Sequence, residues 1–93
     1  MENQHRKISG YRELTQEEID LINEIKAVGL TLGTLVERVN AHIGDQYGND
    51  MAGVEEYDRL EKARPFCWFV TGRDHLQQGL MALTRAVAQP EGF

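Results

Sequence analysis

Residues 15–43 read TQEEIDLINEIKAVGLTLGTLVERVNAHI, and the spacing of the apolar residues in this stretch decides the fold. The apolar residues recur at steps of 4, 3, 4, 3 and 4, in the order Leu21, Ile25, Val28, Leu32, Leu35 and Val39. This spacing is the heptad seam of an amphipathic helix. Thr15 and Glu18 match a capping box, in which each residue's side chain accepts a hydrogen bond from the other's backbone amide. We therefore predict a long helix over residues 16–43.

A second seam predicts another long helix near the C-terminus. Its members follow at steps of 3 and 4 in alternation: Phe66, Phe69, Arg73, Leu76, Leu80, Leu83 and Val87. Pro65 suits the first turn of a helix, and Pro90 lies where a helix must stop. These signals predict a helix over residues 65–88. The intervening residues 44–63 form a linker, in which residues 54–63 are compatible with a short charged helix.

These elements predict an all-α fold, because no stretch shows the alternation of a β-strand. A length of 93 residues allows at most one domain. We expect a single domain over residues 1–93, in which residues 1–14 form a polar arm. The two long helices pair as an antiparallel hairpin, the arrangement that a moderate linker favours.

The hairpin is expected to assemble into a homo-oligomeric helical bundle. Two helices bury one stripe on each other, and this chain has further apolar residues outside its two seams. They are Ile19, Ile22, Gly29, Leu30, Val36 and Ile43 on the first helix, and Trp68, Val70 and Met81 on the second. Such a surface exceeds what monomers usually expose, and symmetric self-association would cover it.

Composition excludes several function classes. The formal net charge of −5 argues against binding to long nucleic acids, which takes many cations. No apolar run approaches the length of a membrane span, so we expect no membrane contact and a cytoplasmic location. The chain has a single cysteine, Cys67, between Phe66 and Trp68, which we interpret as a buried apolar side chain. No catalytic or metal-binding motif is present, so we expect no enzyme, no metal and no cofactor.

Several residues suit the binding of a small anionic ligand. Tyr11 next to Arg12 offers an aromatic face beside a cation, which fits a nucleobase next to a phosphate, although Tyr11 can equally pack the arm onto the hairpin. Lys26 lies off the first seam and can aim at such a ligand or stay solvated. Arg73 occupies a seam position, where an unpaired guanidinium is costly. Its partner is either a carboxylate, Glu37 or Asp74, or a phosphate at an oligomer interface. Arg64, just before Pro65, is a weaker candidate of the same kind.

Both ends of the chain resemble a known phage family. The opening NQHRKISGYRELTQEEID of residues 3–20, continued through Lys26, and the closing DHLQQGLMALTRAVAQP of residues 74–90 are similar to the anti-CBASS cyclic-nucleotide sponges, whose hairpin domain is related to that of Thoeris-inhibiting sponges. The resemblance implies a helical hairpin that assembles as a hexamer in the host cytoplasm. It also implies capture of cyclic dinucleotides such as cyclic GMP-AMP without cleavage, and of cyclic trinucleotides in separate pockets. The residues that match the family's dinucleotide pocket are Tyr11, which would stack on a base, and Lys26, which would pair with a phosphate.

Two other function classes remain open from the sequence. An acidic helical adaptor that binds a host factor through its heptad faces fits the composition equally well. A cyclic-nucleotide phosphodiesterase is disfavoured, because the chain has no metal-ligand or general-base motif.

Overall fold

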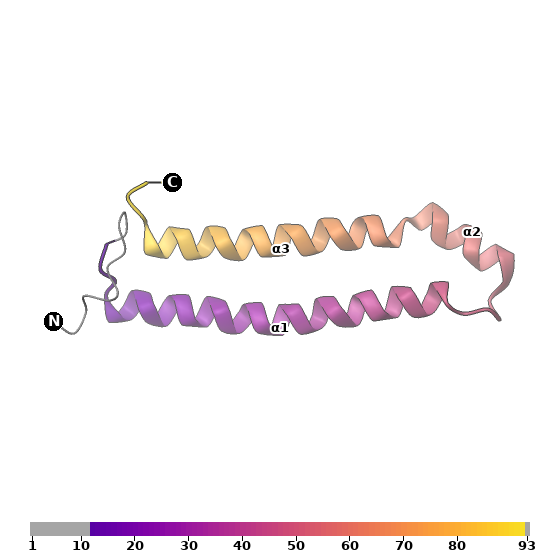
Figure 1. The fold of residues 1–93 in the computed structure, drawn as a ribbon, viewed down its shortest axis with the longest axis horizontal. Helices are drawn as coiled ribbons and strands as arrows, with labels where there is room; N and C mark the ends of the chain where they lie inside the picture. The colour runs from indigo at the N-terminus through magenta and orange to yellow at the C-terminus, as the bar shows by residue number, and fades with distance from the viewer. Residues whose placement is uncertain (1–11, 93) are drawn as a thin grey trace. The chain divides into compact units, whose positions relative to one another are not determined.

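The computed structural model describes residues 12–92, and over these residues the chain is all-helical, with no strand. The three helices are α1 (Gln16–Tyr47), α2 (Gly53–Ala63) and α3 (Pro65–Ala88) (Figure 1). The long helices are arranged in a hairpin-like manner, which confirms the predicted fold class. None of the described helices is long and apolar enough to span a membrane.

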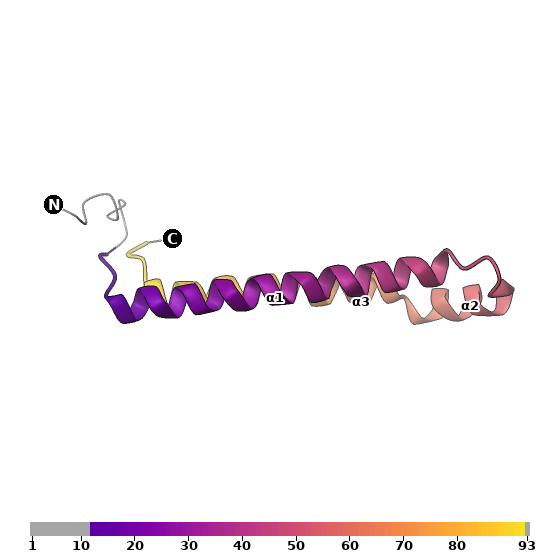
Figure 2. The ribbon, with the colours of Figure 1, turned by 90° about the horizontal axis from the view of Figure 1, so that it is seen from below.

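The helix ends match the sequence signals to different degrees. α3 covers the same range that the second seam predicted. α1 continues to Tyr47, four residues beyond the predicted end at 43, because Gly44 is tolerated within the helix and Gly48 follows its last residue. The short helix that the sequence allowed over residues 54–63 is present as α2, which begins one residue earlier, and residues 48–52 turn the chain between α1 and α2 (Figures 1 and 2).

Arg64 separates α2 from α3. Its backbone is left-handed, with φ 52° and ψ 54°, and its amide donates to the Leu60 carbonyl at 3.0 Å, which closes α2. The following proline disfavours a helical conformation at Arg64, so α2 cannot continue into α3. The Arg64 carbonyl then accepts from the amides of Cys67 and Trp68, which starts α3.

Contacts divide the chain into two units, and α1 and α3 each contribute to both. In its described part, the first unit consists of residues 12–30 and 77–92, and the second consists of residues 31–76. Whether the chain is one domain, as the sequence predicts, therefore remains a prediction.

The hydrophobic core is small and lies in the second unit. Among the described residues, the buried hydrophobic side chains are Ile43, 6% exposed, and Leu60, 2% exposed. The stacked rings of Tyr47 and Phe66, with centroids 5.7 Å apart, add an aromatic contact in the same unit. Cys67 is exposed, so the interpretation of this residue as buried is wrong. In the first unit no described side chain is fully buried.

The covered face of α1 is displaced from the predicted seam. Of the seam residues, Leu21, Val28, Leu35 and Val39 are 40–51% exposed, but Ile25 and Leu32 are partly covered. Ile22, Gly29 and Val36 of the neighbouring row are also partly covered, and Ile43 of that row is buried, so the displacement affects part of the seam. In the first unit, α3 packs against this row at Gly29. A Cβ on Gly29 would lie 3.4 Å from the Leu80 side chain, at the limit of ordinary van der Waals contact. On α3 the seam residue Leu83 is also exposed, and Thr84 is covered instead.

Candidate ligand-binding grooves

The first unit contains a groove between α1 and α3, which we call the Lys26 groove. It has a volume of about 390 Å³ and is lined by Ile25, Lys26, Gly29, Leu80, Met81, Thr84, Arg85, Ala88 and Pro90. Its walls are mostly apolar, and among the described residues that line it the charged ones, Lys26 and Arg85, are both cationic. Lys26, Met81 and Arg85 are exposed, so the groove is open along one side.

This charge arrangement is unusual for the chain, which has 15 acidic and 10 basic residues. An apolar floor favours a flat organic ring, and two cations at its edge favour an anion. The groove therefore offers the complementary chemistry for a ligand that carries both an apolar face and negative charge.

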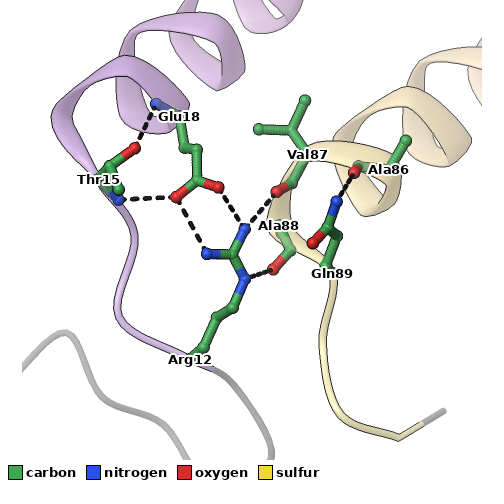
Figure 3. A network of polar contacts seen from close by, with 7 residues as sticks. All are labelled: Arg12, Thr15, Glu18, Ala86, Val87, Ala88 and Gln89. Carbon is green, nitrogen blue, oxygen red and sulfur yellow. Dashed lines mark hydrogen bonds and ion pairs between the residues drawn. The ribbon is translucent and has the colours of Figure 1, made fainter.

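Arg12 and Glu18 form a second feature of the first unit, the end clasp (Figure 3). The Arg12 Nη groups donate to both Glu18 carboxylate oxygens. Arg12 also donates to the carbonyls of Val87, at 2.9 Å from Nη2, and Ala88, at 3.1 Å from Nε. The last carbonyls of a helix have no partner within the helix, and a cation suits this negative end. Arg12 therefore ties residues 12–18 to the end of α3.

The same clasp contains the predicted capping box. Glu18 accepts from the Thr15 amide at 2.7 Å, and the Glu18 amide donates to Thr15 Oγ1 at 3.2 Å. The hydrogen bonds from Arg12 and then from the Thr15 amide lower the pKa of Glu18 from 4.5 to about 2. Glu18 thus caps the start of α1 and holds Arg12 in place.

The low pKa of Glu18 predicts a loss of stability in acid. A carboxylate with a lowered folded-state pKa stabilises the fold above its unfolded pKa, and that stabilisation disappears as the pH falls through the folded value. We expect the free energy of unfolding of the wild type to fall between about pH 4.5 and pH 2, and to fall less in Glu18→Gln. Chemical denaturation along a pH series measures this difference. Glu17→Gln, which alters an exposed neighbour in the same turn, is the control and should follow the wild type. Parallel curves for the wild type and Glu18→Gln would contradict the role of the clasp.

A second groove lies in the second unit, and we call it the Arg73 groove. It has a volume of about 350 Å³ and is lined by Leu35, Val36, Val39, Ile43, Pro65, Trp68, Phe69, Gly72, Arg73 and Leu76. The Arg73 Nε donates to Asp74 Oδ1 at 3.1 Å, and the guanidinium carbon lies 5.8 Å from the centre of the Phe69 ring. Asp74 was one of the two carboxylates that the sequence offered as a partner, and the salt bridge is partly exposed. Arg73 therefore has a partner without a ligand.

The five predicted ligand residues are distributed unevenly over these features. Lys26 lines the Lys26 groove, Arg12 belongs to the end clasp, and Tyr11 lies outside the described residues. Arg73 lines the groove of the second unit, and Arg64 is an exposed residue at the α2–α3 junction that is not among its lining residues. Their roles in ligand binding stay predictions.

Sequence reasoning missed Arg85 as a member of the Lys26 groove. Arg85 stands in the last turn of α3, where a basic residue is ordinarily explained by the negative end of the helix. No spacing in the sequence relates it to Lys26. Only the antiparallel pairing of the start of α1 with the end of α3 brings the two positions to one groove.

A third hollow, at the turn between α1 and α2, differs in charge. Its volume is about 280 Å³, and its charged lining residues are Asp50 and Glu56. Glu56 is paired with Arg59 at 2.6 Å. No cation is among the described residues that line this hollow, so the Lys26 and Arg73 grooves suit an anionic ligand better than it does. In the part of the chain that the structure describes, no group of histidine, cysteine and carboxylate side chains is arranged to hold a metal ion.

Comparison with known proteins places the chain in a family. The model of the family described as "Acb2/Tad1, hairpin domain" matches residues 5–88. The chain belongs to this family. It is also 39% identical, over 107 aligned positions that cover 99% of both chains, to Anti-CBASS protein 2 of Pseudomonas phage JBD67. The family resemblance recognised in the sequence is thereby confirmed.

Proposed function

We propose that this protein is a phage anti-CBASS sponge, which binds cyclic oligonucleotide second messengers in the host cytoplasm and holds them without cleaving them. The observation that carries the proposal is the Lys26 groove, where the described lining residues are mostly apolar and the charged ones among them, Lys26 and Arg85, are both cationic. Membership of the hairpin-domain family and the similarity to Anti-CBASS protein 2 support it. With the messenger captured, the CBASS effector of the host would stay inactive.

The chemistry of the groove favours cyclic dinucleotides such as cyclic GMP-AMP. Lys26 would pair with a phosphate, because charge-assisted hydrogen bonds are the strong ones. Tyr11 would stack on a base. Arg12, whose donors already hold the end clasp, would contribute indirectly. Its hydrogen bonds to the end of α3 fix the chain at the position next to Tyr11 in the sequence. Arg73 in its own groove, with Arg64, is the candidate for a second ligand class such as cyclic trinucleotides.

Sequestration of this kind is proposed to involve a homo-oligomer, for which the family resemblance suggests a hexamer. The described part of the chain exposes many large apolar side chains, among them Leu30 at 77%, Trp68 at 64% and Met81 at 70%. Met81 lines the Lys26 groove, so a neighbouring copy that covers it would also help to close the groove over a ligand. Enclosure by several subunits supplies affinity that one open groove lacks.

An acidic adaptor that binds a host protein is the alternative, since the same exposed apolar side chains could contact another protein. The net charge of −5 is compatible with either function. The two differ in whether a cyclic nucleotide binds to the isolated protein.

Calorimetry with a panel of cyclic di- and trinucleotides tests the proposal, on protein whose mass has been measured by light scattering. We expect binding of at least one cyclic dinucleotide to an oligomer, and a melting temperature that rises with ligand concentration. Chromatography of the ligand released by denaturation should return it intact. Absence of binding across the panel would favour the adaptor, and linear products would show an enzyme instead.

A further inference from the structure

One wall of the Lys26 groove is the end of α3. Ala88, the last residue of this helix, lines the groove together with Pro90, two positions further on. Gln89 between them has a φ of 49°, in the left-handed region, so the helix stops and the chain turns at the edge of the groove. The shape of this wall therefore depends on how firmly the last turn of α3 is held.

The last turn of α3 is held through carbonyls that a helix leaves without partners of its own. Gln89 binds two of them: its amide donates to the Arg85 carbonyl at 2.8 Å, and its side chain donates to the Ala86 carbonyl at 3.1 Å. The last two carbonyls of the helix both accept from Arg12 (Figure 3). The wall of the groove is thus held in part by a residue from the other end of the chain.

Arg12 is in turn held by Glu18, in the first turn of α1. Both carboxylate oxygens of Glu18 accept from the Nη groups of Arg12, and one of them also accepts from the Thr15 amide at 2.7 Å. A carboxylate that meets a guanidinium in this bidentate way fixes its plane, and with it the direction of the N–H groups that reach α3. Glu18 is not among the described residues that line the groove, so it acts on the wall through Arg12.

We propose that Glu18 is a positioning residue of the Lys26 groove. It orients Arg12 so that the carbonyl of Ala88 stays bound, and the wall is already formed when a ligand enters. This inference rests on the proposed function. A preformed wall lowers the entropic cost of binding, because the ligand does not have to order the end of α3 itself.

A merely structural role for Glu18 makes a different prediction. Glu18 and Thr15 form the capping box of α1, and loss of a cap lowers stability without any effect on a groove. Thr15→Ala removes the hydroxyl that accepts from the Glu18 amide, but it leaves the Glu18 carboxylate on Arg12. Under the structural role Glu18→Gln and Thr15→Ala behave alike towards ligand. Under the proposed role only Glu18→Gln weakens binding.

Calorimetric titration with cyclic GMP-AMP compares the wild type with Glu18→Gln, Arg12→Lys, Thr15→Ala and Glu17→Gln. Glutamine still fits a capping box, and lysine keeps the positive charge at the end of α3 but lacks the planar fork. Glu17 is an exposed glutamate of the same turn, so its variant controls for the lost negative charge. We expect Kd to rise roughly threefold to tenfold in Glu18→Gln and Arg12→Lys, and by less than about twofold in the other two.

Hydrogen exchange at the end of α3 gives a readout that a structural role would not move. The Gln89 amide, which donates to the Arg85 carbonyl, reports on the last turn. We expect this amide to exchange faster in free Glu18→Gln than in the free wild type, and ligand to reduce the difference, because the bound ligand orders the wall that the variant leaves loose. In Thr15→Ala the amide should exchange as in the wild type.

The outcomes separate this inference from the proposed function. If the wild type binds no cyclic nucleotide, the proposed function fails and the positioning role fails with it. If the wild type binds, and Glu18→Gln and Arg12→Lys bind as tightly as Glu17→Gln, the proposed function stands and the positioning role is refuted. An equal loss of affinity in Thr15→Ala would also refute it, because the effect would then come from the helix cap.

Discussion

Lys26→Ala is expected to raise the Kd for cyclic dinucleotides roughly 10- to 100-fold, because it removes a charge-assisted contact to phosphate. The change should leave the fold intact, since Lys26 is exposed and its side chain lies at the edge of the groove rather than in a core. Titration calorimetry measures the affinity, and light scattering shows whether the oligomeric state is preserved. Tyr11→Ala is the companion variant, for which loss of base stacking predicts a weakening of similar size.

Lys62→Ala is the matched control for this experiment. Lys62 is also an exposed lysine, but it stands in the last turn of α2 and belongs to the second unit. Its removal changes the net charge by the same amount, so any effect of overall charge on an anionic ligand appears equally in both variants. If Lys26→Ala and Tyr11→Ala both bind like Lys62→Ala, the dinucleotide pocket does not lie where we propose.

Leu60→Ala is expected to cause the largest loss of stability, about 2–4 kcal/mol. Leu60 is 2% exposed and is one of the two buried hydrophobic residues among those described, so the rest of the core is too small to compensate for the cavity. A loss of this size is a large fraction of the total free energy of unfolding of a small protein. Urea denaturation measures the effect at a fixed protein concentration, because assembly would make stability depend on concentration.

Val54→Ala is the control for this loss. Val54 lies in the same helix but is 75% exposed, so its truncation should change the free energy of unfolding by less than about 0.5 kcal/mol. A change of that small size in Leu60→Ala as well would show that α2 adds nothing to the core of the second unit.

The helical fold could be predicted because its signals are local. The Thr15–Glu18 capping box is set by residues three positions apart, and the structure contains both of its hydrogen bonds. Pro65 and the apolar pattern that follows it define the second long helix in the same way. The end of α1 was placed too early, because a glycine such as Gly44 lowers helix stability by only about 1 kcal/mol and does not end a helix that neighbouring residues favour.

The contact face of α1 could not be predicted, because two adjacent rows of the helix are almost equally apolar. The choice between the row of Val28 and the row of Gly29 depends on how closely the partner helix can approach. A Cβ on Gly29 would lie 3.4 Å from the Leu80 side chain, and this closeness is a property of the pair and not of either helix. The same reason explains why the seam residues Leu21, Val28 and Leu35 of α1 are exposed.

The candidate site was predicted in part, from a family resemblance and not from periodicity. Lys26 lines a groove with the expected charge, whereas Arg12 holds helix ends together and Arg73 is paired with Asp74. The sequence alone does not indicate which carboxylate or carbonyl an arginine side chain will contact. The partners of Arg12 are as far as 76 positions away, so only the folded chain identifies them.

The end clasp also makes this chain suitable for circular permutation. Because Arg12 and Ala88 are joined by a hydrogen bond, the chain enters its first helix where it leaves its last one. Proteins in which the entry to the first element lies beside the exit from the last one generally tolerate circular permutation. A short polar peptide is therefore expected to join position 92 to position 12, while the turn at residues 48–52 supplies the new ends. Such a permutant would present α3 before α1 in the order of synthesis, yet keep every helix and both grooves.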